Sequence, residues 1–197
     1  MIRLTLRKAA NGRSFVDGTA ATALHALARQ TPSPKALKSK GKTLIDHPVG
    51  VIKKYLTEIK SLTQYLVVDG YFMKRDFIPP LLCEGLHIIT KMRQDANLKY
   101  LYNKRQKQGK GRAKRYDGKV DVKAIDKGRI KCGYQHKQVK GYAAVLYAVQ
   151  LKQTARVAFV YYMGKTTPEI IVGTDVQMDA LTLCRYYGLR FEVEFLI

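Results

Sequence analysis

Cysteine is scarce in this sequence, and its placement argues against both disulfide bonds and a cysteine-bound metal. Among 197 residues there are only Cys83, Cys132 and Cys184, which are scattered and odd in number. They lack the spacing of metal ligands, so we expect reduced thiols in a cytoplasmic protein. The four histidines form no HxH or HxxxH pair, which argues against a zinc site.

Long apolar runs are also missing. The longest covers 142–149, which is eight residues, whereas a membrane-spanning helix needs about 20. The basic N-terminal segment MIRLTLRKAANGR is not followed by an apolar stretch, so we predict no secretory signal there. We therefore expect no membrane partner.

Acidic residues are the third deficiency. Fifteen Asp and Glu stand against thirty-six Lys and Arg, which leaves a formal net charge of +21. Such an excess repels itself in a folded protein and is usually offset by a polyanion such as nucleic acid. Because 46% of the residues are hydrophobic, the chain can bury a core and is not expected to be disordered.

The first half of the sequence alternates between two hydrophobic patterns. Strands are predicted over 20–29, 65–69 and 86–92, and helices over 48–62 and 75–84. This alternation predicts an α/β sheet with right-handed crossovers. Ligands of such sheets bind beyond the carboxyl ends of the strands, which is where Asp69 closes the run YLVVD.

The composition changes after Asp95. Segment 99–119 contains nine Lys and Arg and one acidic residue, Asp117. With several glycines as well, it cannot bury a core and is predicted to form an exposed loop or ribbon.

The C-terminal part is again apolar. Segments 139–151 and 156–163 predict a hairpin with a polar KQT turn, and 169–173 predicts a further strand. Thr174 and Gln177 have the spacing of a capping box, so a last helix is expected from about residue 175 to the chain end.

Three residues form a polar stripe on this last helix. Tyr187, Arg190 and Glu194 are spaced i, i+3, i+7, which places them within about 60° of one another. Arg190 and Glu194 could form an ordinary i, i+4 ion pair on a solvated helix face, worth about 0.3–0.5 kcal/mol. Asp69, in turn, could be only a cap or turn residue. However, apolar side chains cover much of this helix, and a charged stripe among them is expected to have a partner or a function.

The same residues resemble a known signature. Tyr187-x2-Arg190-x3-Glu194 is similar to the Tyr–Arg–Glu motif of DDE-type bacterial transposases of insertion-sequence family four. Asp69, in VVDGYFMKRDFI, resembles the second catalytic aspartate of that family, at the end of the fourth strand. The likeness covers roughly residues 20–197 and also includes segments 86–102, 111–121 and 185–197.

The resemblance implies a fold and an organisation. The fold would be α/β, a ribonuclease-H-like mixed sheet flanked by helices, with a β-rich insertion before the last catalytic helix. Residues 1–197 would form one partial catalytic domain. Its parts would be a sheet and helix core over 20–95, a basic β-rich insertion over 96–167, and the last strand and catalytic helix over 168–197.

The resemblance also implies a chemistry. Asp69 and Glu194 would be catalytic and would hold Mg²⁺ or Mn²⁺ ions for cleavage and strand transfer of a phosphodiester. Arg190 would contact phosphate and Tyr187 the DNA backbone. Further phosphate contacts without base reading are expected from the basic tract, namely Lys104, Arg105, Lys107, Lys110, Arg112, Lys114 and Arg115. The partner would be double-stranded DNA at transposon ends, bound by a homodimer of the full-length enzyme in the bacterial cytoplasm, at the nucleoid.

Two members of the family pattern have no match here. The first catalytic aspartate lies on the opening strand of the family, upstream of this sequence, and Asp17 lies too close to the strand predicted over 20–29 to replace it. The lysine that follows the family glutamate by six residues would fall beyond Ile197. We therefore expect an incomplete catalytic domain with little activity alone.

Two other classes of protein remain open. A basic nucleic-acid-binding protein without catalysis would explain the charge and the tract, but not Asp69 and the polar stripe. A nuclease with the same sheet would share the carboxylates, and only the Tyr–Arg–Glu pattern favours transposition over it.

Overall fold

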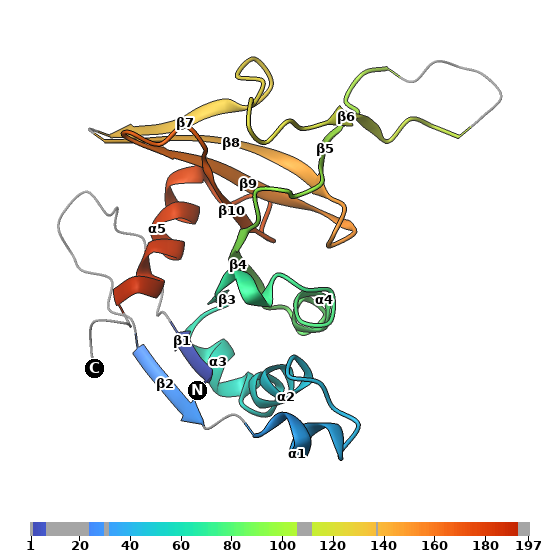
Figure 1. The fold of residues 1–197 in the computed structure, drawn as a ribbon, viewed down its shortest axis with the longest axis vertical. Coiled ribbons are helices and arrows are strands. Elements are labelled where there is room, and N and C mark those ends of the chain that lie inside the picture. Colours follow the sequence, from blue (N-terminus) through green and yellow to red (C-terminus); the bar gives the residue numbers. More distant parts are fainter. Residues whose placement is uncertain (1, 7–23, 30–31, 106–111, 137, 193–197) are drawn as a thin grey trace. The chain divides into compact units, whose positions relative to one another are not determined.

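A computed structural model describes residues 2–6, 24–29, 32–105, 112–136 and 138–192 (Figure 1). The chain forms two compact units. Unit 1 holds residues 1–90 and 185–197, and unit 2 holds residues 91–184. One boundary falls within strand β4 (His87–Met92) and the other within helix α5 (Ala180–Glu192). The predicted α/β class, a mixed sheet with flanking helices, is confirmed.

Unit 1 contains a mixed sheet. Strands β1 (Ile2–Leu6), β2 (Leu24–Arg29) and β3 (Tyr65–Val67) precede β4, and the spatial order is β2-β1-β3-β4. Strand β1 is antiparallel to both β2 and β3, whereas β3 and β4 are parallel. Strand β1 was not predicted from the sequence. The parallel pairing of β3 with β4 was expected, because both are short apolar runs of the kind that is buried in parallel sheets.

The helices of unit 1 are shorter than their patterns suggested. The helix expected over 48–62 is two helices, α2 (Asp46–Lys54) and α3 (Leu56–Leu62), because the backbone of Tyr55 leaves the helical region at φ −110° and ψ 27°. The hydrophobic periodicity did not reveal this break, because Ile52 and Ile59 are both buried, as they would be on the apolar face of a single continuous helix. A further helix, α1 (Pro34–Lys38), begins at Ser33, whose side chain accepts a hydrogen bond from the backbone.

Two prolines delay the helix that was expected over 75–84. Helix α4 (Ile78–Leu82) has Pro79 and Pro80 in its first turn, where a missing N–H costs least. The chain then turns at Gly85, whose φ of 75° favours glycine, and enters β4. Phe77, Ile78 and Leu81 have at most 1% of their surface exposed and belong to the core of this unit.

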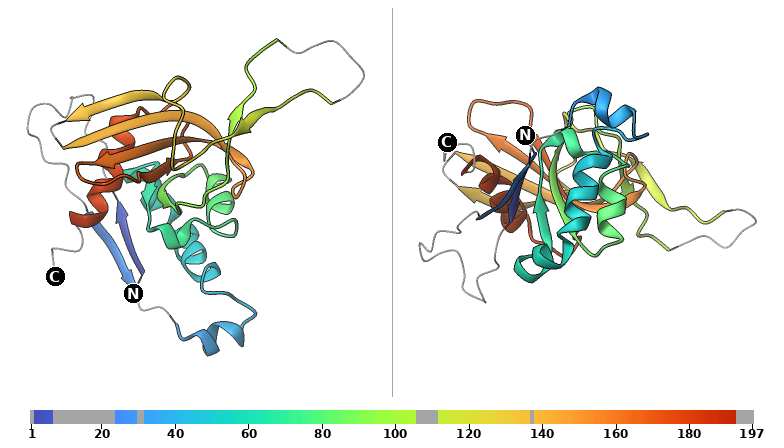
Figure 2. Two further views of the ribbon diagram at one scale, coloured as in Figure 1. Left: turned by 45° about the horizontal axis from the view of Figure 1, so that its top comes forward. Right: turned by 90° about the horizontal axis from the view of Figure 1, so that it is seen from below.

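Unit 2 is mainly an antiparallel sheet. Its longest strands are β8 (Val139–Ala148) and β9 (Gln153–Tyr162), which pair along their whole length (Figure 2). The hairpin prediction is therefore confirmed. Its turn lies at 149–152 and shares only Lys152, at φ 55°, with the expected KQT turn, because Gln153 and Thr154 already belong to β9. Strand β10 (Glu169–Gly173) pairs with β9 and has the predicted bounds.

The other edge of β8 is shared by two strands. Strand β7 (Lys131–His136), which was not predicted, pairs with the beginning of β8, and β5 (Leu98–Leu101) pairs with its end. Strand β6 (Tyr116–Lys119) is antiparallel to β5, so the two described ends of the basic tract form a ribbon, one of the two forms expected for the tract.

Helix α5 begins later than expected. Its first turn is capped by Asp179, whose Oδ1 accepts a hydrogen bond of 2.9 Å from the backbone N–H of Thr182. The predicted capping box at Thr174 is wrong, because Asp175 and Gln177 form a separate turn upstream. None of the described helices combines the length and apolar character that crossing a bilayer requires.

Candidate functional site

Asp69 lies at the end of the parallel strand pair of unit 1, as predicted. The ladder continues one step past β3, where the Val68 N–H donates to the carbonyl of Ile89 at 2.9 Å. The hydroxyl of Thr90, which is fully buried, donates to the Asp69 carbonyl at 3.0 Å. These two bonds tie the backbone of Asp69 to β4 and determine where its side chain leaves the sheet.

Both carboxylate oxygens of Asp69 have partners. Oδ1 accepts the backbone N–H of Tyr71 at 2.9 Å, which makes Asp69 the N-cap of the 3₁₀ helix η2 (Gly70–Phe72). Oδ2 accepts a bond from Arg190 Nη1 at 2.6 Å. Asp69 therefore has the capping role that was the simpler interpretation of it, and it also forms an ion pair with Arg190. Since the Asp69 side chain is 53% exposed, the carboxylate remains accessible to solvent.

Arg190 is held from a second side by Tyr187. Its guanidinium carbon lies 5.4 Å from the centre of the Tyr187 ring, within the range of cation–π attraction. Tyr187 is only 3% exposed, and its burial argues for orienting Arg190 rather than for direct contact with DNA. One position earlier on α5, Tyr186 packs edge-on against Tyr65 of β3 at 5.6 Å. The C-terminal part of α5 is thus seated on the strand that ends in Asp69.

The predicted metal-ligand set is only partly visible. Glu194 and Asp17 lie outside the described residues. In the part of the chain that the structure describes, no three His, Cys, Asp or Glu side chains gather as a metal site would require. Asp69 alone, with one oxygen engaged by Arg190, does not fit a two-ion site. Such a site would need Glu194 and a further carboxylate.

The basic tract presents its cations to solvent. Lys104, Arg105, Arg112, Lys114 and Arg115 are exposed, whereas Lys107 and Lys110 lie outside the described residues. The two arms of the ribbon are joined beyond β5 and β6 by a backbone bond of 3.0 Å from the residue 102 N–H to the residue 115 carbonyl. The roles of these side chains in DNA binding stay predictions.

One acidic residue organises the base of this ribbon. Asp117 accepts hydrogen bonds from Lys114 Nζ and Arg129 Nη2, both at 3.0 Å. The Lys114 ammonium, with help from Lys104 and Arg129, holds the pKa of the Asp117 carboxyl below its ordinary value. Sequence reasoning missed Arg129. It stands in the polar stretch DKGRIK, where no periodicity or motif distinguishes one cation from another.

The candidate site of unit 1 therefore consists of Asp69, Arg190 and the Tyr187 ring, and unit 2 supplies an exposed set of cations. No protein-family model, no curated protein and no solved structure matches this chain.

Proposed function

We propose that this chain is part of the catalytic domain of a DDE-type bacterial transposase of insertion-sequence family four, which cleaves and joins DNA. The observation that carries the proposal is the contact between Asp69 and Arg190. These residues are separated by 121 positions in the sequence, and they belong to the two motifs that resemble the family. Two unrelated surface motifs would have no reason to meet at the end of one strand.

The pairing of strands supports the proposal in a second way. Strands β3 and β4 are parallel, and Asp69 lies just past the carboxyl end of β3. Ligands of α/β sheets bind at this end of parallel strands, which is where a catalytic carboxylate is expected.

The distribution of charge supports DNA as the substrate. Unit 2 contains twenty Lys and Arg and seven Asp and Glu. A surface with this excess attracts the phosphate backbone without reading bases, as transposition into varied targets requires. In the complete domain, Asp69 and Glu194 with the upstream aspartate would form the carboxylate set that binds Mg²⁺.

The proposal is tested by metal binding in an extended chain. The neighbouring coding sequence should encode an upstream strand ending in aspartate and a lysine at position 201, where the family signature places it. A protein that includes both segments should bind Mn²⁺, and the bound ion should broaden the NMR signals of residues around Asp69 by paramagnetic relaxation. Asp69→Ala should abolish this local broadening. Asp76→Ala, which removes another exposed carboxylate of unit 1, should leave it unchanged.

The 197-residue chain alone should bind duplex DNA but fail to nick a supercoiled plasmid in Mg²⁺ or Mn²⁺. Robust nicking that depends on Asp69 would show that the catalytic set is already complete. If the extended chain shows no metal binding at Asp69 while DNA binding persists, the alternative is correct and the protein is a non-catalytic, basic nucleic-acid-binding protein.

A further inference from the structure

A groove in unit 2 lies outside the candidate site around Asp69. It is bordered by the end of β5, the base of the β5–β6 ribbon, the loop that leads into β7, and the middle of β8. Its volume is about 670 Å³. We call it the Arg129 groove, and the side chains that matter are Asn103, Lys104, Asp117, Arg129, Lys131 and Leu146.

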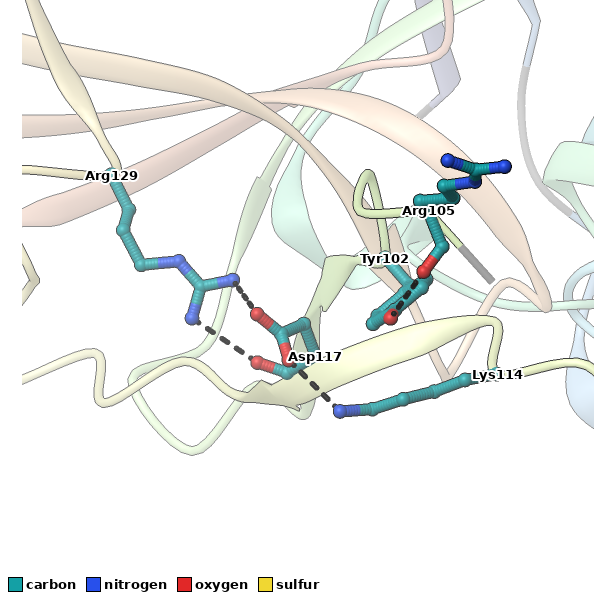
Figure 3. A network of polar contacts seen from close by, with 5 residues as sticks. All are labelled: Tyr102, Arg105, Lys114, Asp117 and Arg129. Atoms are coloured by element: carbon teal, nitrogen blue, oxygen red, sulfur yellow. Dashed lines mark hydrogen bonds and ion pairs between the residues drawn. The ribbon is translucent and has the colours of Figure 1, made fainter. Parts of the chain in front are cut away.

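Arg129 is held in this groove by two hydrogen bonds and a ring contact. Its Nη1 donates to the Asp117 carbonyl at 3.1 Å, and its Nη2 donates to Asp117 Oδ2 at 3.0 Å (Figure 3). Its guanidinium carbon lies 3.7 Å from the centre of the Tyr100 ring, which is 8% exposed. A guanidinium has five N–H donors in a rigid plane, and these two bonds use two of them. Asp117 and Tyr100 therefore hold the plane in one orientation while other donors remain for a ligand.

Positively charged side chains outnumber the one carboxylate, Asp117, on the lining of the groove. That carboxylate is shared by Arg129 and by Lys114, which approaches from the ribbon (Figure 3). Lys104 and Lys131 also line the groove, and neither forms an ion pair with any residue that the structure describes. Because the three cations on the lining outnumber its one carboxylate, an anionic ligand is attracted rather than repelled.

The apolar part of the groove determines which anion fits. Ala144, Val145 and Leu146 of β8 also line the groove and add apolar atoms to it beside the cations. A small inorganic anion gains nothing from such a lining, whereas a sugar–phosphate chain presents carbon-rich sugars between its phosphates. The groove is also continuous with the ribbon, whose exposed Arg112 and Arg115 extend the cationic path.

We propose that the Arg129 groove binds the phosphodiester backbone of duplex DNA, with Arg129, Lys104 and Lys131 as phosphate donors and Asp117 as the residue that positions Arg129. The choice of duplex DNA as the polymer rests on the proposed function; the groove itself is inferred from unit 2 alone. Phosphate contacts of this kind carry affinity and register and do not read sequence.

The test is the salt dependence of binding, measured by fluorescence anisotropy of a labelled duplex of mixed sequence with the full 197-residue chain. Each phosphate contact contributes about one unit to the slope of log K against log salt. Lys104→Gln with Lys131→Gln should therefore lower that slope by about two units. Lys38→Gln with Lys40→Gln, which removes the same charge from exposed positions of unit 1, should leave the slope unchanged.

A second pair of variants separates positioning from net charge. Asp117→Asn adds one positive charge but weakens the support of Arg129, so we expect affinity to fall about 3- to 10-fold, since charge-assisted bonds are about twice as strong as neutral ones. Arg129→Lys keeps the charge but loses the fork and the stacking on Tyr100, and should weaken binding similarly. Tighter binding by Asp117→Asn would show that only net charge matters and would overturn the positioning role.

The proposal fails if the groove double variant and the unit 1 control have equal slopes. Tighter binding of single-stranded RNA of equal length, with the same loss in the groove variant, would overturn the assignment to duplex DNA. Failure of the metal-binding test at Asp69 leaves this outcome untouched, because the groove is measured by affinity alone. Circular dichroism of each variant verifies that the fold is intact.

Discussion

The contact between Asp69 and Arg190 allows a quantitative prediction, because its two partners differ in exposure. The Arg190 side chain is 22% exposed and the Asp69 side chain 53%. Loss of the carboxylate leaves a largely covered guanidinium without its anion, whereas loss of the guanidinium leaves a carboxylate that water can solvate. A double-mutant cycle with Asp69→Asn and Arg190→Met measures the coupling free energy of this pair.

The expected magnitude follows from this geometry. Exposed ion pairs contribute about 0.2–1 kcal/mol, and partial burial with a charge-assisted hydrogen bond moves a pair to the upper end of that range. We expect a coupling free energy of about 1 kcal/mol, and a larger cost for Asp69→Asn than for Arg190→Met. Asp69→Ala should cost about 1 kcal/mol more than Asp69→Asn, because it also removes the cap of η2.

The assay is urea unfolding followed by circular dichroism, repeated in about 1 M salt, where screening should reduce the coupling. The Arg93–Asp95 pair of unit 2 is the control, because its side chains are 87% and 72% exposed. Asp95→Asn with Arg93→Gln should show almost no coupling. Equal coupling in both pairs, or no coupling at Asp69, would refute the view that α5 is held to the end of β3 by this bond.

Four further predictions concern unit 2 and α5. Gly188→Ala should raise the free energy of unfolding by about 0.5–1 kcal/mol, because its Cβ meets no atom within 4 Å in an exposed helix interior. Gly141→Ala should lower the free energy of unfolding by about 1–3 kcal/mol, because its Cβ would lie 2.1 Å from a tyrosine ring of β7. Chemical denaturation measures both glycine variants, and a change of the same sign in the two would contradict the packing. Burial raises the pKa of the Cys184 thiol to about 11. At about pH 8 iodoacetamide should therefore label the exposed Cys83 and Cys132 first. Equal labelling rates of the three cysteines, measured by mass spectrometry, would contradict the burial of Cys184. Two opposite effects act on the pKa of the Asp179 carboxyl: burial raises it, and hydrogen bonds from Thr182 lower it. The hydrogen bonds outweigh burial, so the pKa lies below its ordinary value of 3.8. Its contribution is thus present above pH 3.8 and lost as pH falls below it, so Asp179→Ala should cost about 1 kcal/mol near neutral pH, and a cost that did not shrink in acid would contradict this assignment.

Several features of the fold could be predicted from the sequence because they depend on local pattern. The run LHIITKM predicted the strand observed as β4, and 169–173 predicted β10 with its observed bounds. The density of lysine, arginine and glycine predicted an exposed loop or ribbon, and the described ends of the tract form a ribbon. Burial of one face imposes a period, and a period is visible in a single sequence.

The candidate site was predictable only in part. Asp69 and Arg190 were each selected from the sequence, one by its place after an apolar run and the other by helical spacing. That they bond to one another could not be predicted, since nothing local relates residues 121 positions apart. The interruption of the helix at Tyr55 was hidden for the opposite reason, because both halves keep the same buried face.

By itself, the sequence determined the excess of positive charge, the α/β class and the placing of Tyr187 and Arg190 on the last helix, because composition and periodicity are properties of neighbouring residues. Only the tertiary structure decided that Asp69 is the partner of Arg190 and that Asp117 holds Arg129 against Tyr100. The chain has thirty-six cations. Which of them is fixed by a carboxylate and a ring depends on how strands and loops pack, and no local pattern contains that information.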